Sequence, residues 1–408
     1  MPDLALLLMR HGYHAVARDR ADRGGADTYV SRFLGRRTVV LGDADGARAF
    51  YDESLASRAG AVPPPLAWLL FGRGAVHGTD GSTHRDRKRL FLDVLDPTTL
   101  PPLLEEVCRQ LEDASASWAG REVHLHRELG RIYGRAVLRW AGIELPPAEE
   151  DAVSARLAAI VDGFGFAPAA YVRAWWARLR ADRWAERLVL DAREGRAEPA
   201  SGTALERFAR ADQLDARSAG VELLNVLRPT VAVSWLGSFA ALALAATPGE
   251  HRARLREDDA ELERHAFVQE VRRTSPFVPV LTARAVRAEE VARVRVRPGD
   301  RLVLDVIGID HHARRWPDPH TFRPDRLLHE DTAHAPSAYD LVPQGGGHLS
   351  GHRCPGEALT LALLSETVRV LAGLDLHVPD PRVDATRMPT LPGGRALVRV
   401  GGAPAPAA

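Results

Sequence analysis

The longest hydrophobic stretch of the chain is "VELLNVLRPTVAVSWLGSFAALALAA", residues 221–246. Apolar residues fall on nearly every face of a helix with this sequence, which predicts a helix buried on all sides. Arg228 and Pro229 interrupt the pattern near its middle. Proline removes one helical hydrogen bond, at a cost of about 3 kcal/mol, and a buried charge is unfavourable without a partner. Two unfavourable residues side by side indicate a functional site.

Apolar residues three or four positions apart predict further helices, and alternating positions predict a few short strands. The predicted helices cover residues 101–119, 126–143, 169–194, 260–275 and 358–374. The predicted strands lie in residues 36–42, 292–308 and 395–400, and the middle segment reads as a hairpin that turns at residues 298–300. The fold class that follows is mainly α with a small β portion.

Composition and charge narrow the class of protein. The 408 residues are 45% hydrophobic and 26% charged, and the formal net charge is zero, so no general attraction to nucleic acid or acidic membranes is expected. The apolar run at residues 4–9 is too short for a membrane anchor and lacks the basic start of a signal peptide. Two cysteines do not make a disulfide framework. We expect one cytoplasmic domain over residues 1–408, with a flexible tail from about residue 401.

Cys354 follows a glycine-rich loop, "LVPQGGGHLSGHRCPGE", and stands directly before a strongly apolar helix. The helix dipole and the unpaired N–H groups at a helix start stabilise a thiolate. Glycines let the main chain lie close to a flat ligand. These features suit a thiolate that binds haem iron, although a buried, inert cysteine at a loop–helix junction fits the local sequence equally well.

Further motifs precede this loop in a fixed order. They are "HRDRK" with His84 and Lys88, "QEVRR" with Glu270 and Arg273, and "WPDPHTFRPDRL". Together with the Cys354 loop they resemble the cytochrome P450 superfamily, whose fold holds a haem between a long distal helix and the cysteine loop.

The resemblance implies a role for each motif. Cys354 would bind the iron of haem b, and Glu270 and Arg273, with Arg323 or Arg326, would form a structural charge network. The haem propionates would be met by His84, Lys88, His352 and Arg58, each of which alone fits a solvated surface position. One departure is Gly347, which stands seven residues before the cysteine where the superfamily usually has phenylalanine.

Several stretches narrow the resemblance to the bacterial fatty-acid peroxygenase and decarboxylase branch. They are "LFGRGAVHGTDGSTHRDRKRLF", "DGFG", "VLRP", "QEVRRTSPF", "PQGGG", "GHRCPGE" and "RMPTLPG". That branch lacks the usual acid–alcohol pair in the distal helix, and the substrate's own carboxylate takes its place. The resemblance therefore implies that Arg228 binds a carboxylate, that Pro229 shapes the distal surface, and that hydrogen peroxide replaces a redox partner. From the residues alone, Arg228 could instead pair with an internal acid such as Glu222 or Glu270.

The resemblance also implies which residues lie near the bound substrate. His77 occupies a position that is often glutamine in hydroxylating members and histidine in the best-known decarboxylase, so terminal alkenes and α- or β-hydroxy acids are both expected products. A loop histidine without a catalytic part is the alternative for His77. The acyl channel would be lined by Leu70, Phe71, Val161, Phe164, Phe277, Val278 and Val280. Val280 stands where relatives carry a bulkier aromatic residue, which suggests a wider channel.

Two other functions fit a haem-thiolate protein. One is a conventional monooxygenase that needs a reductase and oxygen, which the missing acid–alcohol pair disfavours. The other is a non-catalytic haem protein that carries or senses a ligand. A separate metal site at His311, His312, His329 and His334 is not expected, because the first two are adjacent and the others lie in an acidic loop-like stretch.

Overall fold

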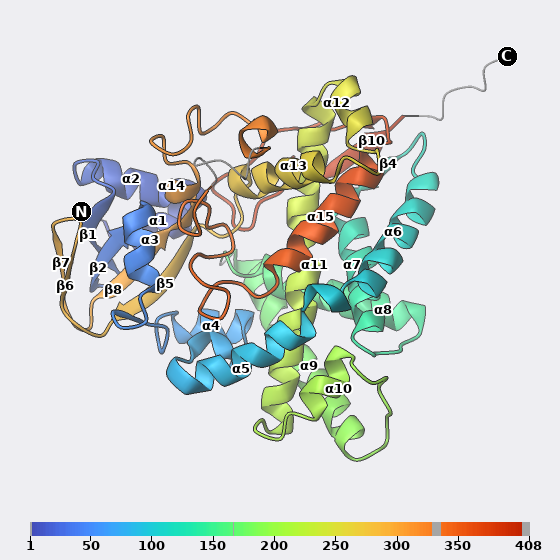
Figure 1. Cartoon of the computed structure of the whole chain (residues 1–408), viewed down its shortest axis with the longest axis horizontal. Helices are drawn as coiled ribbons and strands as arrows, with labels where there is room; N and C mark the ends of the chain where they lie inside the picture. Colours follow the sequence, from blue (N-terminus) through green and yellow to red (C-terminus); the bar gives the residue numbers. More distant parts are fainter. Residues whose placement is uncertain (1, 166, 329–335, 402–408) are drawn as a thin grey trace.

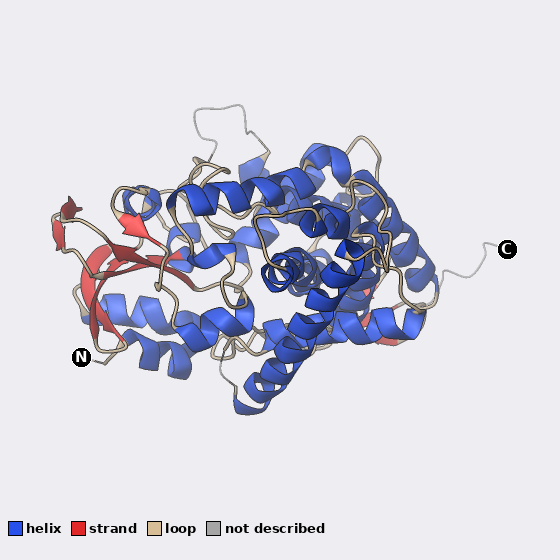
Figure 2. Ribbon diagram, turned by 90° about the horizontal axis from the view of Figure 1, so that it is seen from below, coloured by secondary structure: helices blue, strands red, loops and turns tan. Residues whose placement is uncertain are grey.

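The protein has a large helical part, and its strands gather mainly at one end (Figure 2). The computed structural model describes residues 2–165, 167–328 and 336–401. The α-helices are α1 (Leu4–His11), α2 (Ala15–Asp22), α3 (Ala44–Tyr51), α4 (Pro64–Leu70), α5 (Gly81–Val94), α6 (Pro101–Ala116), α7 (Leu125–Trp140), α8 (Pro147–Asp162), α9 (Pro168–Arg193), α10 (Ala204–Ala209), α11 (Ala216–Ala246), α12 (Gly249–Arg254), α13 (Glu261–Thr274), α14 (Val306–Asp310) and α15 (Glu357–Leu371). The strands are β1 (Thr28–Phe33), β2 (Arg36–Leu41), β3 (Ala56–Ser57), β4 (Glu122–His124), β5 (Val280–Ala285), β6 (Glu289–Val291), β7 (Val294–Val296), β8 (Arg301–Asp305), β9 (Leu376–His377) and β10 (Leu397–Val400).

Helix α11 is the central element of the helical part (Figure 1). It packs against α7, α9 and α15, and the carboxylate of Asp215 caps its first turn by accepting from the Ser218 N–H. By length and composition α11 could cross a membrane, but 72% of its most apolar window is buried inside the protein. The helix continues unbroken through Pro229, so the predicted buried helix is confirmed with its arginine and proline inside it.

The other predicted helices are confirmed as α6, α7, α9, α13 and α15, and their bounds differ from the predicted ones by at most a few residues. The apolar stripe of each one faces the common core, which contains residues of all five helices. Two of them flank the site described below, because α13 packs on α15 and α15 packs on α11. The prediction of a mainly α protein is therefore confirmed.

The hairpin predicted at residues 298–300 is wrong. The turn exists, since the Asp300 N–H donates to the Arg297 carbonyl, but the strands on its two sides enter different sheets. Strand β8 lies inside a five-stranded sheet of order β1-β2-β8-β5-β3, parallel to β2 and antiparallel to β5, whereas β7 pairs only with β6. Every residue of β8 is buried, and both of its edges are occupied by β2 and β5, which leaves no edge for β7.

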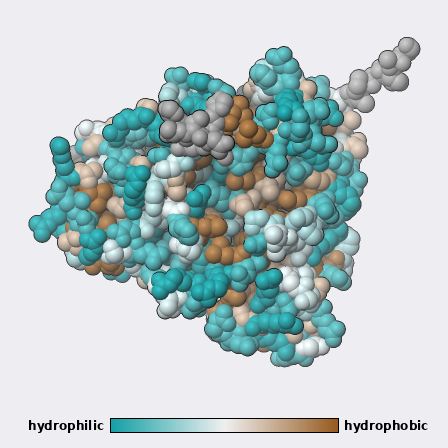
Figure 3. All heavy atoms as spheres, in the orientation of Figure 1, coloured by the Kyte–Doolittle hydropathy of each residue, from teal (hydrophilic) through white to brown (hydrophobic). Residues whose placement is uncertain are grey.

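The face of the molecule seen in Figure 3 is mostly hydrophilic, with apolar residues in scattered spots. At the C-terminus the Gly401 N–H still donates to the Asp375 carbonyl at 2.8 Å. The main chain is therefore hydrogen-bonded to the rest of the fold at residue 401, where the flexible tail was predicted to begin. Residues 402–408 lie outside the described part of the chain.

Candidate active site

Cys354 lies at the end of the glycine-rich loop, three residues before α15 begins. Its N–H donates to the Gln344 carbonyl at 3.0 Å, and the Nε2 of Gln344 lies 3.8 Å from the cysteine Sγ. The same Nε2 donates to the Thr360 hydroxyl at 2.9 Å, which holds the amide in place. Burial raises the pKa of the Cys354 thiol, whereas the Gly356 N–H and the charge of Lys88 lower this pKa. Sequence reasoning missed Gln344, although it lies in the quoted "PQGGG".

Gly347 stands where the superfamily usually has phenylalanine, and its backbone conformation and its neighbour Tyr51 explain why this chain has glycine there. Gly347 has a φ of +78°, which favours glycine, and a Cβ added to it would lie 3.4 Å from the Cβ of Tyr51. The Tyr51 hydroxyl would lie 2.7 Å from a Cβ on Gly345. The aromatic ring packed on this loop thus comes from the last residue of α3 instead of from the loop itself.

A cluster of cationic and imidazole side chains lies beside the loop. The rings of His84 and His352 stack with their centroids 3.9 Å apart, and the buried Lys88 ammonium donates to the carbonyl of Arg353. The buried guanidinium of Arg58 donates to the Phe50 carbonyl at 3.1 Å, and its Nη1 has no partner among the described residues. Burial first, and then the neighbouring cations, lower the pKa of His84 to about 4 and that of His352 to about 3.

The charge network predicted behind this site is present in α13. Arg273 donates from Nε and Nη2 to the two carboxylate oxygens of Glu270 at 2.8 and 2.7 Å, and its Nη1 donates to the carbonyls of Asp310 and Pro319. The side chain that joins Glu270 from the later loop is Arg326, at 3.2 Å. Arg323 contributes only its backbone N–H, at 2.9 Å, because its guanidinium pairs with an exposed aspartate.

Arg272, which sequence reasoning passed over, connects this network to the cysteine loop. Its fully buried guanidinium donates to Glu357 Oε1 at 2.6 Å, while Arg353 donates to the other oxygen of the same carboxylate at 2.6 Å. Glu357 is the first residue of α15, so both arginines hold the start of that helix directly behind Cys354.

Arg228 is buried in α11, and it pairs with neither of the internal acids that the sequence offered as partners. Glu222 accepts from Val76, Asn225 and Arg87, and Glu270 accepts from its own network, so neither acid pairs with Arg228. No ion pair joins Arg228 to an acid within the described ranges, and its Nε has no hydrogen-bond partner there. Burial, and then the charge of Arg178, lower the pKa of Arg228 to about 9, so the guanidinium is charged at neutral pH.

The hydroxyl groups around Arg228 in α11 are all engaged within the helix. Thr230 donates to the Val226 carbonyl at 2.9 Å, Ser234 donates to the carbonyl three residues earlier, and Ser238 donates to the one four residues earlier. A hydroxyl bound this way does not face a ligand as a proton donor. This agrees with the absence of an acid–alcohol pair from the sequence of the helix.

His77 lies on the loop after α4, in the short turn Val76–Gly78. Its ring stacks on that of Phe71 with centroids 4.1 Å apart and planes 11° apart. Burial, and next the positive charge of Arg228, lower the pKa of His77 to about 3. Although protein atoms surround the ring, His77 keeps an exposed surface. The structure thus brings His77 and Arg228 to the same region.

Three of the predicted channel residues meet on one side of α11. Val161 and the rings of Phe164 and Phe277 pack with Ala232 and Trp235, which follow Arg228 by four and seven residues on the same helix face. Val280 lies beside this group in a cluster that shares Phe164, whereas Leu70 and Val278 are half-buried and lie outside both clusters. Trp235 was not predicted, although its spacing from Arg228 is the signal that would have identified it.

The adjacent residues His311 and His312 lie apart from the cationic cluster in their contacts. His311 contacts the Ile307 carbonyl and stacks on His320, whereas the Nε2 of His312 lies 3.1 Å from Asp27. The two adjacent side chains thus have different partners, as predicted. His329 and His334 lie outside the described residues.

Comparison with known proteins agrees with this geometry. Residues 264–368 match the family model of cytochrome P450. Cytochrome P450SP alpha (CYP152B1), solved in complex with (R)-ibuprofen, is 36% identical, with a TM-score of 0.90 over 98% of both chains. The chain belongs to the cytochrome P450 family. A variant of cytochrome P450 OleT in complex with arachidonic acid is 30% identical, with a TM-score of 0.91 over 99% of this chain and 98% of that chain.

A third solved P450, cytochrome P450EX alpha (CYP152N1) with myristic acid, is 30% identical with a TM-score of 0.89 over 97% of this chain and 96% of that one. Among curated sequences, dimethylnonatriene synthase of Arabidopsis thaliana is 33% identical over 31% of this chain. The match spans 24% of the length of that relative, so the likeness to curated sequences is confined to one segment. The three solved P450s, in contrast, match this chain over nearly its full length.

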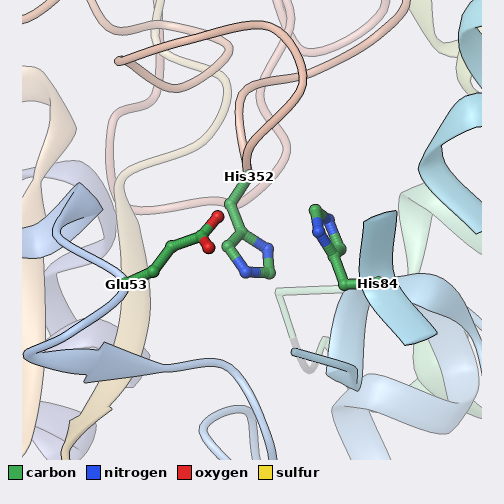
Figure 4. Close-up of side chains that lie close together, drawn as sticks. All are labelled: Glu53, His84 and His352. Atoms are coloured by element: carbon green, nitrogen blue, oxygen red, sulfur yellow. The ribbon is translucent and has the colours of Figure 1, made fainter. Parts of the chain in front are cut away.

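Cytochromes P450 carry a thiolate-bound haem, and the cationic cluster of this P450 fits the haem propionates. Glu53, His84 and His352 lie together in Figure 4, with donor atoms within 4.8 Å of one another, as a metal site would require. Lys88 and Arg58 add two positive charges to the same place, however, and Glu53 is exposed. The two cations oppose a metal ion here, whereas the carboxylate of Asp80, 3.4 Å from the Nε2 of His352, acts in the other direction. The unpartnered Nη1 of Arg58 is a donor of the kind that a propionate would satisfy.

Proposed function

We propose that this P450 is a hydrogen-peroxide-dependent haem-thiolate peroxygenase that acts on fatty acids or related carboxylic acids. Its products are terminal alkenes formed by decarboxylation, α- or β-hydroxy acids, or both. The observation that carries this proposal is Arg228, a buried and charged guanidinium without an acid partner in the described part of the chain. Solved relatives that hold arachidonic acid, myristic acid or (R)-ibuprofen, each a carboxylic acid, support it.

Cys354 would bind the iron, and Arg58, His84, Lys88 and His352 would hold the propionates. The bound haem supplies the oxidising chemistry that hydrogen peroxide starts. Glu270 and Arg273 keep the proximal side of this site in shape, since they tie α13 to the last residue of α14 and to the loop that contains Pro319 and Arg323.

Arg228 would bind the carboxylate of the substrate through a two-pronged, charge-assisted pair, for which a guanidinium is suited. Because Thr230, Ser234 and Ser238 donate to helix carbonyls, the helix offers no free hydroxyl for proton transfer at this point. The carboxylate held at Arg228 takes over that task by accepting and returning the proton of hydrogen peroxide. Substrate binding thus completes the catalytic group, and no redox partner is needed.

The hydrocarbon chain would run from Arg228 past Ala232 towards Phe164, Phe277 and Trp235, whose rings border one apolar cluster. Anchoring the carboxylate places the α- and β-carbons of the acid next to the reacting group. Loss of a hydrogen from the β-carbon is consistent with both product types. Hydroxylation at that carbon gives the β-hydroxy acid, whereas removal of a further electron with loss of carbon dioxide gives the terminal alkene.

The deciding experiment treats the purified haem protein with saturated fatty acids of several lengths and hydrogen peroxide, and identifies products by mass spectrometry. A terminal alkene one carbon shorter shows decarboxylation, and a 2- or 3-hydroxy acid shows hydroxylation. Turnover with NADPH and redox partners but none with peroxide would instead identify a conventional monooxygenase. Binding without any product would identify a non-catalytic haem protein.

His77 is expected to influence the product ratio. Substituting His77→Gln changes the hydrogen-bonding group beside Arg228 and is expected to lower the alkene-to-hydroxy-acid ratio by about threefold, as a hydrogen bond is worth about 0.5–1.5 kcal/mol. The ratio is measured by gas chromatography on extracts of matched reactions. An unchanged ratio would remove His77 from the choice between products.

The pH dependence of that ratio follows from the pKa of His77. A histidine with the usual pKa of 6.5 would change its charge near neutral pH, but burial and the charge of Arg228 lower the pKa of His77 to about 3. The ring is therefore neutral throughout the range of about pH 5 to 8, and the product ratio is expected to stay constant there. A change in the ratio with a midpoint near pH 6.5 would contradict this.

We further propose that the enzyme is soluble and cytoplasmic. The apolar α11 is a core helix, and the two cysteines form no disulfide with each other, which suits a reducing compartment.

A further inference from the structure

A buried carboxylate lies under the loop that carries His77 and has no role in the function proposed above. Glu222 is fully buried in α11, six residues before Arg228. Its Oε1 accepts from the Val76 N–H at 2.8 Å, and its Oε2 accepts from the Asn225 Nδ2 at 3.1 Å. Val76 is the residue directly before His77, so this carboxylate is bonded to the main chain next to the histidine.

Two neighbouring side chains bind the same loop at other points. The Nδ2 of Asn225 also donates to the Phe71 carbonyl at 2.9 Å. The guanidinium of Arg87, from α5, donates to the Gly74 carbonyl and lies 3.4 Å from Glu222 Oε1. The loop is therefore held at Phe71, Gly74 and Val76. Glu222 itself binds Val76, and its carboxylate also contacts Asn225 and Arg87, which bind Phe71 and Gly74.

A glutamate at position 222 can accept the hydrogen bonds of this arrangement, whereas an apolar residue could not. The main-chain N–H of Val76 is buried and needs an acceptor, and a carboxylate has enough lone pairs to serve Val76, Asn225 and Arg87 together. The positive charge of Arg87, which is partly exposed, compensates the buried negative charge. The result is a bond from the inner face of α11 to a loop that has no regular secondary structure between residues 71 and 75.

We propose that Glu222 is a positioning residue, which holds the His77 loop at a set place relative to Arg228 and thereby sets the ratio of alkene to hydroxy acid. This inference rests on the proposed function, because it assigns the ratio to the relative position of His77 and the carboxylate bound at Arg228. The stacked Phe71 and His77 rings move with the same loop, so a loosened loop would change both walls of the site.

The test compares Glu222→Leu, which removes every acceptor, with Glu222→Gln, which keeps one oxygen for the Val76 N–H. We expect Glu222→Leu to change the product ratio by about threefold or more, in the direction of the His77→Gln change, and Glu222→Gln to change it less. Amide hydrogen exchange of the peptide covering residues 71–78 is a readout without turnover. There we expect Glu222→Leu to speed exchange about tenfold, and Glu222→Gln to have a smaller effect.

The matched control is Glu150→Gln together with Glu150→Leu. Glu150 is also a buried glutamate, but it lies in α8 and pairs with Arg139, away from the loop. These variants are expected to lose stability without any change in product ratio or in exchange at residues 71–78. If the Glu222 variants behaved in the same way as the Glu150 variants, the positioning role would be overturned.

A second variant covers the case in which Glu222→Leu does not fold. Arg87→Met removes the hydrogen bond from the partly exposed Arg87 side chain to the Gly74 carbonyl. This variant is expected to speed amide exchange in the loop and to change the product ratio in the same direction as Glu222→Leu. Unchanged exchange and ratio in Arg87→Met and Glu222→Gln would overturn the proposal. If the wild-type enzyme made neither product, the proposed function would be wrong and no product ratio could be measured. The hydrogen-exchange measurement would still decide whether Glu222 holds the loop.

Discussion

Arg228→Ala is expected to lower kcat/KM for fatty acids with hydrogen peroxide by roughly a hundredfold or more, since losing one partner of a buried charge pair costs about 2–5 kcal/mol. Both product types should fall together, because the carboxylate that Arg228 binds also handles the proton of the peroxide. Steady-state product formation, measured at several fatty-acid concentrations, gives kcat and KM separately. Titration of the haem absorbance with fatty acid gives the loss of affinity without turnover.

Two controls separate this anchor from a general defect. Arg228→Lys keeps the positive charge but loses the two-pronged geometry, so it should retain part of the activity. Arg228→Ala should still take up haem and bind imidazole as the wild type does, because removing an unpaired buried charge leaves no partner behind. Normal turnover of fatty acids by Arg228→Ala would show that the substrate carboxylate is not held there.

Arg273→Ala is expected to have the largest effect on stability. Arg273 is buried, pairs with both oxygens of Glu270, and donates to two carbonyls later in the chain. Its removal takes two donors from the buried Glu270 carboxylate, which keeps Arg326 and the Arg323 N–H on Oε1, and it leaves two carbonyls without their donor. Breaking a buried pair in this way costs about 3–5 kcal/mol. Urea unfolding of the haem protein measures the loss, and the yield of bound haem per chain should fall with it.

The matched control for that prediction is Arg323→Ala. Among the described residues its side chain pairs with Asp325 at the surface, and its contribution to the network is the main-chain N–H, which alanine keeps. An exposed pair is worth about 0–1 kcal/mol, so stability and haem content should stay near those of the wild type. If Arg323→Ala and Arg273→Ala lost equal stability, the assignment of the network to Arg326 would be wrong.

The sequence predicted the helical part of the fold well, because each long helix carries its own apolar period. It failed at residues 292–308, where local alternation suggested a hairpin. The choice of partner for β8 depends on β2, more than 250 residues earlier in the chain, and on β5, and no local pattern reports such a choice. The turn itself was predicted correctly, and only its consequence for pairing was wrong.

Within the site, residues with a motif of their own could be predicted, and residues whose importance depends on a neighbour could not. Arg228 was found because it is out of place in an apolar helix. Gln344, Arg272 and Glu222 look ordinary in the sequence, and only the fold shows that they contact the cysteine sulfur, the start of α15 and the His77 loop. The sequence also did not decide whether Arg323 or Arg326 is the third member of the charge network, because the choice depends on which of the two side chains points towards Glu270.

The bond from the Lys88 ammonium to the carbonyl of Arg353 joins residues 265 positions apart in the chain. Contacts of such separation form late in folding, because the loop they close must lose its entropy before they become favourable. The propionate-binding groups and the cysteine loop therefore come together only after most of the helical core has formed. Haem can then be captured only by a chain that is already largely folded, so the rate of haem uptake by the refolding protein should report the closing of this long loop.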